Sequence, residues 1–307
     1  MFRWMINKIR RAVLVARIFR LGLQNRFSQS SMTEIGGPVV SLTTYGKRAR
    51  TVFLTIESIA AGEVRPSRIL LWLDDVTVYQ KLPSVLRRLQ ERGLEIRLCR
   101  NYGPHTKYYP YIESEEDFLL PLVTADDDII YPRYWLKHLL AAWREVPETV
   151  SCYRARVVSL AGRSLAPYST WQLCSTQEES SRLLATGVSG VIYPPAFQKA
   201  LKKAGDSFKQ CCPRADDLWL HVQALRTGVK VRQIGKRAVH FAIIPWTQEG
   251  SLYSQNVVQA DGNDRQISAT YTDSDIVNLA REGVNLAFED DQSRAGGRHL
   301  HMESSAR

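Results

Sequence analysis

The central part of the chain alternates short apolar runs with amphipathic segments. Runs that are apolar throughout are typical of strands buried on both faces, whereas apolar positions three and four apart are typical of helices that cover a sheet. In chain order, the pattern predicts a strand at 39–43, a helix at 51–60, a strand at 68–73, a helix at 82–92, a strand at 94–99 and a strand at 118–124 that Pro121 interrupts. This order indicates an α/β fold with a mostly parallel sheet and helices on both faces.

The second half of the chain is less regular. It predicts helices at 133–145 and 216–226, strand regions at 149–160, 229–234 and 238–243, and a turn at 161–164. After about residue 274 the pattern is helical or loose, and the tail from residue 290 is expected to be disordered. We therefore expect one α/β domain at 38–273 and a partly disordered extension at 274–307.

Residues 1–27 have a helical period of their own. Arg3, Arg10 and Arg17 recur every seven residues, and the longest stretch without a charge after Arg11 is the five residues 12–16. That is too short for a membrane span or a signal sequence. The apolar residues on one side are Phe2, Met5, Ile9, Val13, Ala16 and Phe19, with Trp4 and Phe27 as aromatic anchors.

This basic amphipathic helix suits the surface of an anionic membrane. The alternative is a solvated helix that packs on the body or on a partner. A small, polar segment at 28–37 reads as a linker between this arm and the domain.

The charge is concentrated in the same arm. The 307 residues contain 41 Lys and Arg against 31 Asp and Glu, a net charge of +10. Seven basic residues and no acid lie in residues 1–27, so the other 280 residues carry 10 − 7 = +3. A nearly neutral body argues against a nucleic-acid partner. The odd number of cysteines, five, and the absence of a C-x-x-C pair indicate reduced thiols in a cytosolic protein.

Polar residues follow the predicted strands at their carboxyl ends, where ligands bind in such sheets. Thr43 and Tyr45 follow the first strand, and Asp74 and Asp75 follow the second. Residues 126–128, all aspartates, follow the fourth.

Three adjacent carboxylates repel one another, so this cluster indicates a cation site. Carboxylates suit magnesium or manganese, which also bind substrate phosphates. In an extended segment Asp126 and Asp128 would share a face, and Asp127 would point elsewhere. The alternative is a solvated acidic turn.

Two further segments carry candidate chemistry. The segment 103–111 brings His105 and Lys107 together with tyrosines, and suits phosphate and a base or sugar, or else is an ordinary basic surface loop. Asp216 and Asp217 open a predicted helix, where either can be a cap or a general base.

Other signals are weaker. His240 lies in a short apolar run, where a histidine is either a core residue or a ligand. Gly187 and Gly190 either let a ligand approach the backbone closely or form a turn.

Taken in order, the segments resemble the nucleotide-sugar glycosyltransferases of GT-A fold, particularly the bacterial family-2-like enzymes of capsule and surface-polysaccharide synthesis. The resemblance covers about residues 38–270. It is carried by VVSLTTYGKR, TVFLTIESI, RILLWLDD, PHTKYY, TADDDIIYP, TGVSGVIYPP, CPRADDLWL and AVHF.

The resemblance implies a role for each of these segments. Asp126 and Asp128 would bind a divalent metal that bridges the donor diphosphate, and His240 would complete the metal site. Asp217, with Asp216 beside it, would supply the catalytic base, and the acceptor loop would contain Gly187, Ser189 and Gly190. The donor would contact Thr43, Tyr45, Asp74, Asp75 and Asp127, and His105 and Lys107 are added to this set as the phosphate-binding segment.

The activity implied is metal-dependent transfer of a sugar, with Mn²⁺ or Mg²⁺, to a hydroxyl of a glycan or lipid-linked acceptor. Inversion by single displacement is favoured over retention, and UDP is the commoner donor nucleotide for this fold, with GDP as the alternative. The arm would place the enzyme on the inner face of the cytoplasmic membrane. Two other readings stay open: a metal-dependent nucleotidyltransferase or phosphohydrolase, and a non-catalytic basic membrane-binding module.

Overall fold

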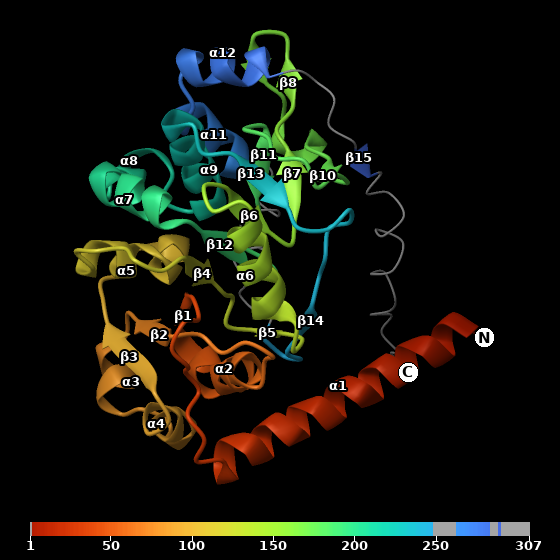
Figure 1. Cartoon of the computed structure of the whole chain (residues 1–307), viewed down its shortest axis with the longest axis vertical. Coiled ribbons are helices and arrows are strands. Elements are labelled where there is room, and N and C mark those ends of the chain that lie inside the picture. The colour runs from red at the N-terminus through yellow and green to blue at the C-terminus, as the bar shows by residue number, and fades with distance from the viewer. Residues whose placement is uncertain (1, 248–261, 283–287, 290–307) are drawn as a thin grey trace, which may run out of the picture.

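A computed structural model of the protein describes residues 2–247, 262–282 and 288–289. Its centre is a seven-stranded sheet in the order β13-β6-β12-β4-β1-β2-β3 (Figure 1). The strands are β1 (Val39–Thr44), β2 (Arg68–Leu73), β3 (Leu94–Leu98), β4 (Leu122–Thr124), β6 (Val150–Cys152), β12 (Val191–Tyr193) and β13 (Val231–Gln233). All neighbouring pairs are parallel except those of β12, which runs antiparallel to both β4 and β6. The predicted α/β fold with a mostly parallel sheet is confirmed.

Each central strand feeds two separate cores, one on each face of the sheet. In β2, Leu70 and Trp72 belong to one core, while Ile69 and Leu71 belong to the other. This follows from the two-residue period of a strand, and it explains why the strands are apolar throughout. Helices α5 (Tyr109–Ser114), α7 (Pro195–Ala204) and α9 (Asp216–Thr227) cover the first face, and α2 (Val52–Ala60), α4 (Ser84–Gln90) and α6 (Trp135–Glu145) cover the second.

The remaining elements lie around this sheet. A second sheet has the order β11-β7-β10-β15, and the pairs β14-β5 and β8-β9 are separate. These strands are β5 (Ile129–Ile130), β7 (Ala155–Val157), β8 (Leu160–Ala161), β9 (Ser164–Leu165), β10 (Leu173–Cys174), β11 (Leu183–Ala185), β14 (Ala242–Ile243) and β15 (Phe288–Glu289). The other described helices are α3 (Val76–Gln80), α8 (Phe208–Cys211), α11 (Gly262–Thr270) and α12 (Asp273–Arg281), with 3-10 turns η1 (Gly46–Arg50), η2 (Gly103–Lys107) and η3 (Tyr168–Thr170).

Several predicted boundaries differ from the structure. The predicted strand at 149–160 is divided among β6, β7 and β8, and the predicted helix at 82–92 is the shorter α4, preceded by α3. The predicted strand at 118–124 is reduced to β4, which begins after Pro121, because proline has no N–H for the sheet. The turn at 161–164 is confirmed as the β8-β9 hairpin, in which Gly162 has φ +63°. The tail from residue 290 lies outside the described residues.

The predicted N-terminal helix is confirmed as α1 (Phe2–Phe27), a long rod along one end of the molecule (Figure 1). Its inner side docks through Leu21, which is buried with Leu54 of α2, and through Leu14 and Ile18. A polar network fixes its last turns: Gln24 Nε2 donates to Glu57 Oε2 at 2.8 Å. The carboxylate of Glu57, which is fully buried, also pairs with Arg92.

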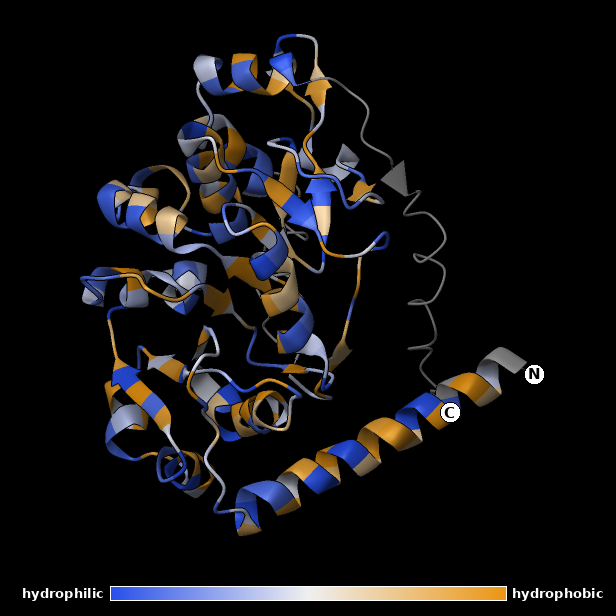
Figure 2. Ribbon diagram, in the orientation of Figure 1, coloured by the Kyte–Doolittle hydropathy of each residue, from blue (hydrophilic) through white to orange (hydrophobic). Residues whose placement is uncertain are grey.

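The opposite side of α1 carries an apolar stripe that the body does not cover. Figure 2 shows hydrophobic residues alternating with hydrophilic ones along the whole helix. The exposed residues of this stripe are Met5, Ile9, Val13, Phe19, Leu23 and Phe27. They recur at intervals of four or six residues and lie about opposite the docking side when α1 is drawn as a regular helix.

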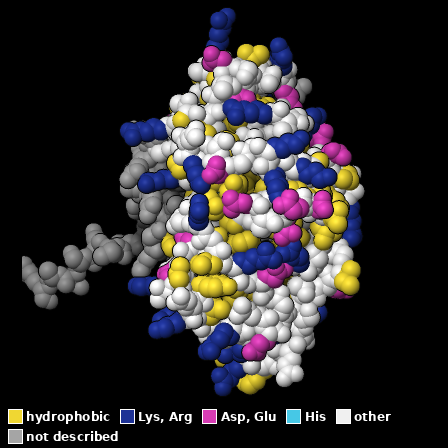
Figure 3. All heavy atoms as spheres, turned by 90° about the vertical axis from the view of Figure 1, so that its left-hand side faces the viewer, with side chains coloured by type: hydrophobic (Ala, Val, Ile, Leu, Met, Phe, Trp, Pro, Cys, Tyr) yellow, Lys and Arg dark blue, Asp and Glu magenta, His cyan; other side chains and the backbone are white. Residues whose placement is uncertain are grey.

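Three broader observations bear on what the sequence predicts. On the face shown in Figure 3, basic and acidic side chains are interspersed, as expected for a body of nearly neutral charge. None of the five cysteines, all within the described residues, forms a disulfide. No described helix combines the length and hydropathy needed to cross a membrane.

Candidate active site

The three aspartates at 126–128 lie in a turn between β4 and β5. The alternation expected of an extended segment therefore does not apply. Asp127 is buried and accepts hydrogen bonds from Thr44 Oγ1 at 2.6 Å and from Arg48 Nη1 at 2.8 Å. Asp128 also faces Arg48, with 3.4 Å between Oδ2 and Nη2. The expected pairing of Asp126 with Asp128 is thus replaced by a pairing of Asp127 and Asp128 around one arginine.

Arg48 is a site residue that the sequence reasoning missed. It lies in η1, directly after β1, and its guanidinium also stacks over Tyr45, with 5.3 Å between Cζ and the ring centroid. Three adjacent carboxylates signalled that a cation is needed, but no spacing in the sequence identifies an arginine 79 residues away as that cation. Burial raises the pKa of Asp128 to about 6, and its neighbours Asp126 and Asp127 add to the shift.

Asp126 turns toward Lys107 instead. Lys107 Nζ lies 3.6 Å from Asp126 Oδ1 and 3.0 Å from Asp216 Oδ2, and its side chain is 14% exposed. Burial by itself lowers the pKa of Lys107, but Asp216, Asp126 and Asp217 outweigh it and hold the pKa well above the ordinary value. The ammonium therefore joins two segments that are far apart in the sequence, the acidic turn and the first turn of α9.

Asp217 lies beside this lysine and is held by the loop before β12. The backbone N–H of Gly187 donates to Asp217 Oδ1 at 2.9 Å. Burial and the neighbouring Asp216 raise the pKa of Asp217 to about 7, although Lys107 opposes the shift. A carboxylate that titrates near pH 7 is suited to accept a proton from a substrate. Asp217 lies in the first turn of α9, but the N-cap residue of this helix is Ala215, and Asp217 Oδ1 accepts from Gly187 of another segment. Of the two alternatives, the geometry therefore favours the base over the cap.

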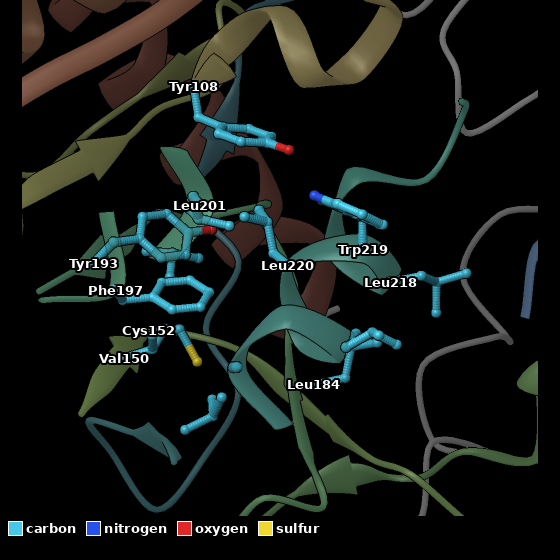
Figure 4. Packing of buried hydrophobic residues seen from close by; sticks show 14 of the residues in the cluster. Tyr108, Val150, Cys152, Leu184, Tyr193, Phe197, Leu201, Leu218, Trp219 and Leu220 are labelled. Atoms are coloured by element: carbon cyan, nitrogen blue, oxygen red, sulfur yellow. The ribbon is translucent and has the colours of Figure 1, made fainter. Parts of the chain in front are cut away.

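Buried residues fix the direction in which α9 presents its acidic pair. Leu218, Trp219 and Leu220 follow Asp217 directly and belong to the same buried cluster as Tyr193 and Phe197. Figure 4 shows Leu220 on the side toward these two rings and Leu218 on the other side. Because three consecutive side chains of α9 are buried, the first turn of the helix has little freedom to rotate.

The glycine-containing loop has two different parts. A Cβ at Gly187 would lie 2.6 Å from Lys107 Nζ and 3.2 Å from Asp217 Oδ1, so this position faces the charged cluster. At Gly190, where φ is +102°, a Cβ would lie within 2.7 to 2.9 Å of the Trp135 ring. Ser189, at φ +78°, is buried and donates from Oγ to Val239 O at 2.7 Å. Gly187 thus lies at the site, whereas Ser189 and Gly190 are packed against the core.

The residues predicted to bind the nucleotide lie at the carboxyl ends of β1 and β2. Tyr45 is 43% exposed, and Thr43 is half-buried and donates to Trp72 O at 3.2 Å. Asp74 accepts from Asn101 Nδ2. Asp75 caps α3, because its Oδ1 accepts from the backbone N–H of Thr77 at 2.8 Å.

The two predicted histidines have different surroundings. His105 is completely buried: its ring nitrogens bond Tyr108 Oη at 2.9 Å and Cys212 O at 2.7 Å, and its ring stacks on Phe208. Burial lowers the pKa of His105 to about 4, so the ring is neutral at pH 7. The structure therefore places His105 in the core and not at the surface that a phosphate would reach.

His240 is exposed, and its Nε2 accepts from Arg154 Nε at 3.1 Å. Within the described part of the chain, no three His, Cys, Asp or Glu side chains are grouped so as to hold a metal ion. Asp126, Asp128 and His240 are therefore not gathered into such a group.

The acidic turn nevertheless suits a divalent cation that takes part of its shell from a substrate. Asp126 and Asp128 offer hard carboxylate oxygens, and the pKa of Asp128 is raised first by burial and further by the neighbouring Asp126 and Asp127. Magnesium commonly uses one or two carboxylates together with substrate phosphates.

Comparison with known proteins gives only distant likenesses. No protein-family model and no curated protein matches the chain. Among solved structures, the mannosyltransferase PcManGT from Pyrobaculum calidifontis, in complex with GDP-Man and Mn²⁺, has a TM-score of 0.48 at 12% identity over 82% of this chain and 70% of that one. S. aureus TarS 1–349 gives 0.45 at 13% over 79% and 70%, and CMP:2-keto-3-deoxy-manno-octonic acid synthetase complexed with CTP gives 0.41 at 12% over 73% and 98%. Likenesses this weak leave the reaction to be argued from the side chains of this chain.

Proposed function

We propose that the protein is a glycosyltransferase that moves a sugar from a nucleotide-diphosphate donor to a hydroxyl group of a glycan or lipid-linked acceptor. The observation that carries the proposal is the ion-pair bridge of Lys107 between Asp126 and Asp216. It brings the acidic turn, suited to a cation and a diphosphate, next to a carboxylate suited to accept a proton. Glycosyl transfer from a nucleotide sugar needs both at one place.

In the proposed step, Asp217 takes the proton from the acceptor hydroxyl, and the oxygen forms a bond to the anomeric carbon of the donor. The bond from that carbon to the diphosphate oxygen breaks, and its electron pair leaves with the nucleoside diphosphate. The N–H of Gly187 fixes one oxygen of Asp217, which leaves the other oxygen as the proton acceptor. Direct displacement inverts the anomeric carbon, and an NMR determination of the product's anomeric configuration tests this against retention.

A divalent cation, Mn²⁺ or Mg²⁺, would be held by Asp126 and Asp128 and would offset the charge of the leaving diphosphate. The chain itself supplies the contacts to the rest of the donor. Tyr45, which is exposed at the end of β1, presents a ring on which a base can stack. Asp74 and Thr43 lie beside it at the same edge, where they can bond a base or ribose. UDP is the first donor nucleotide to test, with GDP as the alternative.

The sharpest test of the reaction is the identity of the released product. Wild-type protein with Mn²⁺ and a panel of nucleotide sugars should release a nucleoside diphosphate, and Asp217→Asn should abolish this while donor binding by calorimetry persists. A nucleotidyltransferase would release pyrophosphate from a nucleoside triphosphate instead, so an assay for both products separates the two reactions. If neither product forms across the panel, the proposal fails.

We also propose that α1 rests on the anionic inner face of the cytoplasmic membrane and brings the site to a lipid-linked acceptor. The support is the exposed apolar stripe from Met5 to Phe27 together with basic residues such as Lys8 and Arg20 beside it. Removal of residues 1–27 should release the protein from anionic liposomes in a sedimentation assay. Equal sedimentation of both forms would contradict this placement.

A second variant tests the apolar stripe of α1 without deleting the helix. Replacing Ile9, Val13 and Phe19 by Ser changes only exposed side chains, so the docking side with Leu21 stays intact. The same three replacements should weaken liposome binding without lowering the melting temperature.

A further inference from the structure

We propose that Lys107 is a built-in counter-cation of the active site, which holds Asp126 and Asp216 together and thereby weakens the intrinsic affinity of the acidic turn for divalent cations. The inference deepens the proposed function, since it assumes that Asp126 is one of the residues that would hold the cation. It assigns Lys107 a positioning role that differs from a direct contact to phosphate.

The position of the ammonium supports this role. Lys107 Nζ lies between the two carboxylates, 3.0 Å from Asp216 and 3.6 Å from Asp126, and it is largely buried. A cation approaching Asp126 therefore meets a positive charge that is already in place. Arg48 likewise places a positive charge next to the turn, because it forms ion pairs with Asp127 and Asp128.

The backbone around Lys107 holds it in this place. Its carbonyl oxygen accepts from Ser41 Oγ at 2.7 Å, and the same hydroxyl accepts from Trp72 Nε1 at 2.9 Å. Ser41 and Trp72 belong to β1 and β2, so the residue is tied to the rigid centre of the sheet. Gly187 leaves room for the ammonium, because a Cβ there would lie 2.6 Å from Nζ.

The balance of charge predicts the sign of the effect. Five carboxylates, Asp126, Asp127, Asp128, Asp216 and Asp217, are set in this region, and in the described residues Lys107 and Arg48 form ion pairs with four of them. Without Lys107 the region gains one net negative charge. Even with water-like screening, a unit positive charge about 5 Å from a divalent ion lowers its affinity about tenfold.

The test is the binding of Mn²⁺ alone, measured by electron paramagnetic resonance on the full-length protein without donor. Lys107→Met should bind Mn²⁺ at least about tenfold more tightly than the wild type, whereas Lys107→Arg, which keeps the charge, should stay within about threefold. Lys209→Met is the matched control, because it removes a lysine from an exposed pair with Asp206. Its Mn²⁺ affinity should equal that of the wild type.

A double variant locates the effect. Lys107→Met combined with Asp126→Asn should lose the gain in Mn²⁺ affinity, because the carboxylate that Lys107 neutralises is then absent. Lys107→Gln serves as a second uncharged variant if Lys107→Met does not fold, with the same expected gain.

Three results would overturn the inference: unchanged or weaker Mn²⁺ binding by the uncharged variants, a gain that persists in the double variant, or no Mn²⁺ binding by any form. Sugar transfer by the wild type is read separately. If the wild type transfers sugar but the uncharged variants bind Mn²⁺ no more tightly, only the role of Lys107 is refuted. If the variants bind Mn²⁺ more tightly but the wild type transfers no sugar, only the proposed function is refuted.

Discussion

Replacing Asp217 by Asn should make the protein more stable and at the same time inactive. Asn keeps an oxygen that can accept the N–H of Gly187, but it has no charge. In the wild type, burial and Asp216 raise the pKa of Asp217 from 3.8 to about 7. The folded protein therefore opposes ionisation of this group, and the substitution removes that opposition.

The sign and size of the effect follow from linkage. At a pH well below 3.8, the pKa of Asp217 in the unfolded chain, the carboxyl group is protonated in both the folded and the unfolded state. At such a pH it does not lower the stability of the fold. As the pH rises from about 4 to 7, the unfolded state ionises first and the folded state loses stability relative to it. The rise in the pKa of Asp217 from 3.8 to about 7 corresponds to roughly 4 kcal/mol of unfolding free energy once the group is fully ionised.

Urea unfolding of wild type and Asp217→Asn across this pH range measures the difference directly. We expect the variant to be more stable by about 2 to 4 kcal/mol near pH 8, with the gap closing toward pH 4. Titratable groups far from Asp217 contribute equally in both proteins and cancel in the difference. Transfer activity of the variant should fall by about 10² to 10⁴, the usual contribution of a general base. A stability difference that is the same at both ends of the range would refute the reasoning, because an uncharged role for Asp217 predicts no pH dependence.

Two further substitutions test the packing and charge of the site. Gly190→Ala places a Cβ within 2.7 to 2.9 Å of the Trp135 ring. It should reduce the unfolding free energy by about 3 kcal/mol and lower the melting temperature accordingly. Gly228→Ala, also at positive φ but in the left-handed helical region and with nothing within 4 Å, should cost only about 1 to 2 kcal/mol, so equal costs would contradict the steric argument. Arg48→Met leaves Asp127 and Asp128 without their arginine and should cost about 3 kcal/mol in urea unfolding. Arg232→Met is the control, because Arg232 is about as buried as Arg48 but its partner Glu145 is 68% exposed. The control should lose less unfolding free energy, and the difference between the two variants measures the cost of leaving Asp127 and Asp128 buried without their arginine. Equal losses would show that packing alone is responsible.

Much of the fold could be predicted because its signals are local. The apolar runs of β1, β2 and β3 are buried on both faces, so each strand appears in the sequence without reference to the others. The period of residues 2–27 likewise predicts α1. The strands around residues 149–160 were harder to separate, because short strands that belong to three different sheets have no long period to detect.

The candidate site was predicted in part for the same reason. Residues 126–128 and the pair at 216 and 217 are visible as clusters of charge, and the structure brings them to one lysine. The partners of individual side chains were not visible. The sequence around His105 does not indicate that its ring bonds Cys212 O and stacks on Phe208. Likewise, the sequence around Asp127 does not indicate that Arg48 is its partner.

By itself, the sequence determined the α/β alternation, the basic amphipathic arm and the residue types of the site, since these depend on local period and composition. Only the tertiary structure decided that Lys107 and Arg48 divide the acidic turn between them and that the half-buried Asp217 accepts from the N–H of Gly187. It also decided which side of α1 faces the body. The physical reason is that charge pairing and burial depend on distances in space, and the fold brings together residues far apart in the sequence, such as Arg48 and Asp127, which are 79 positions apart.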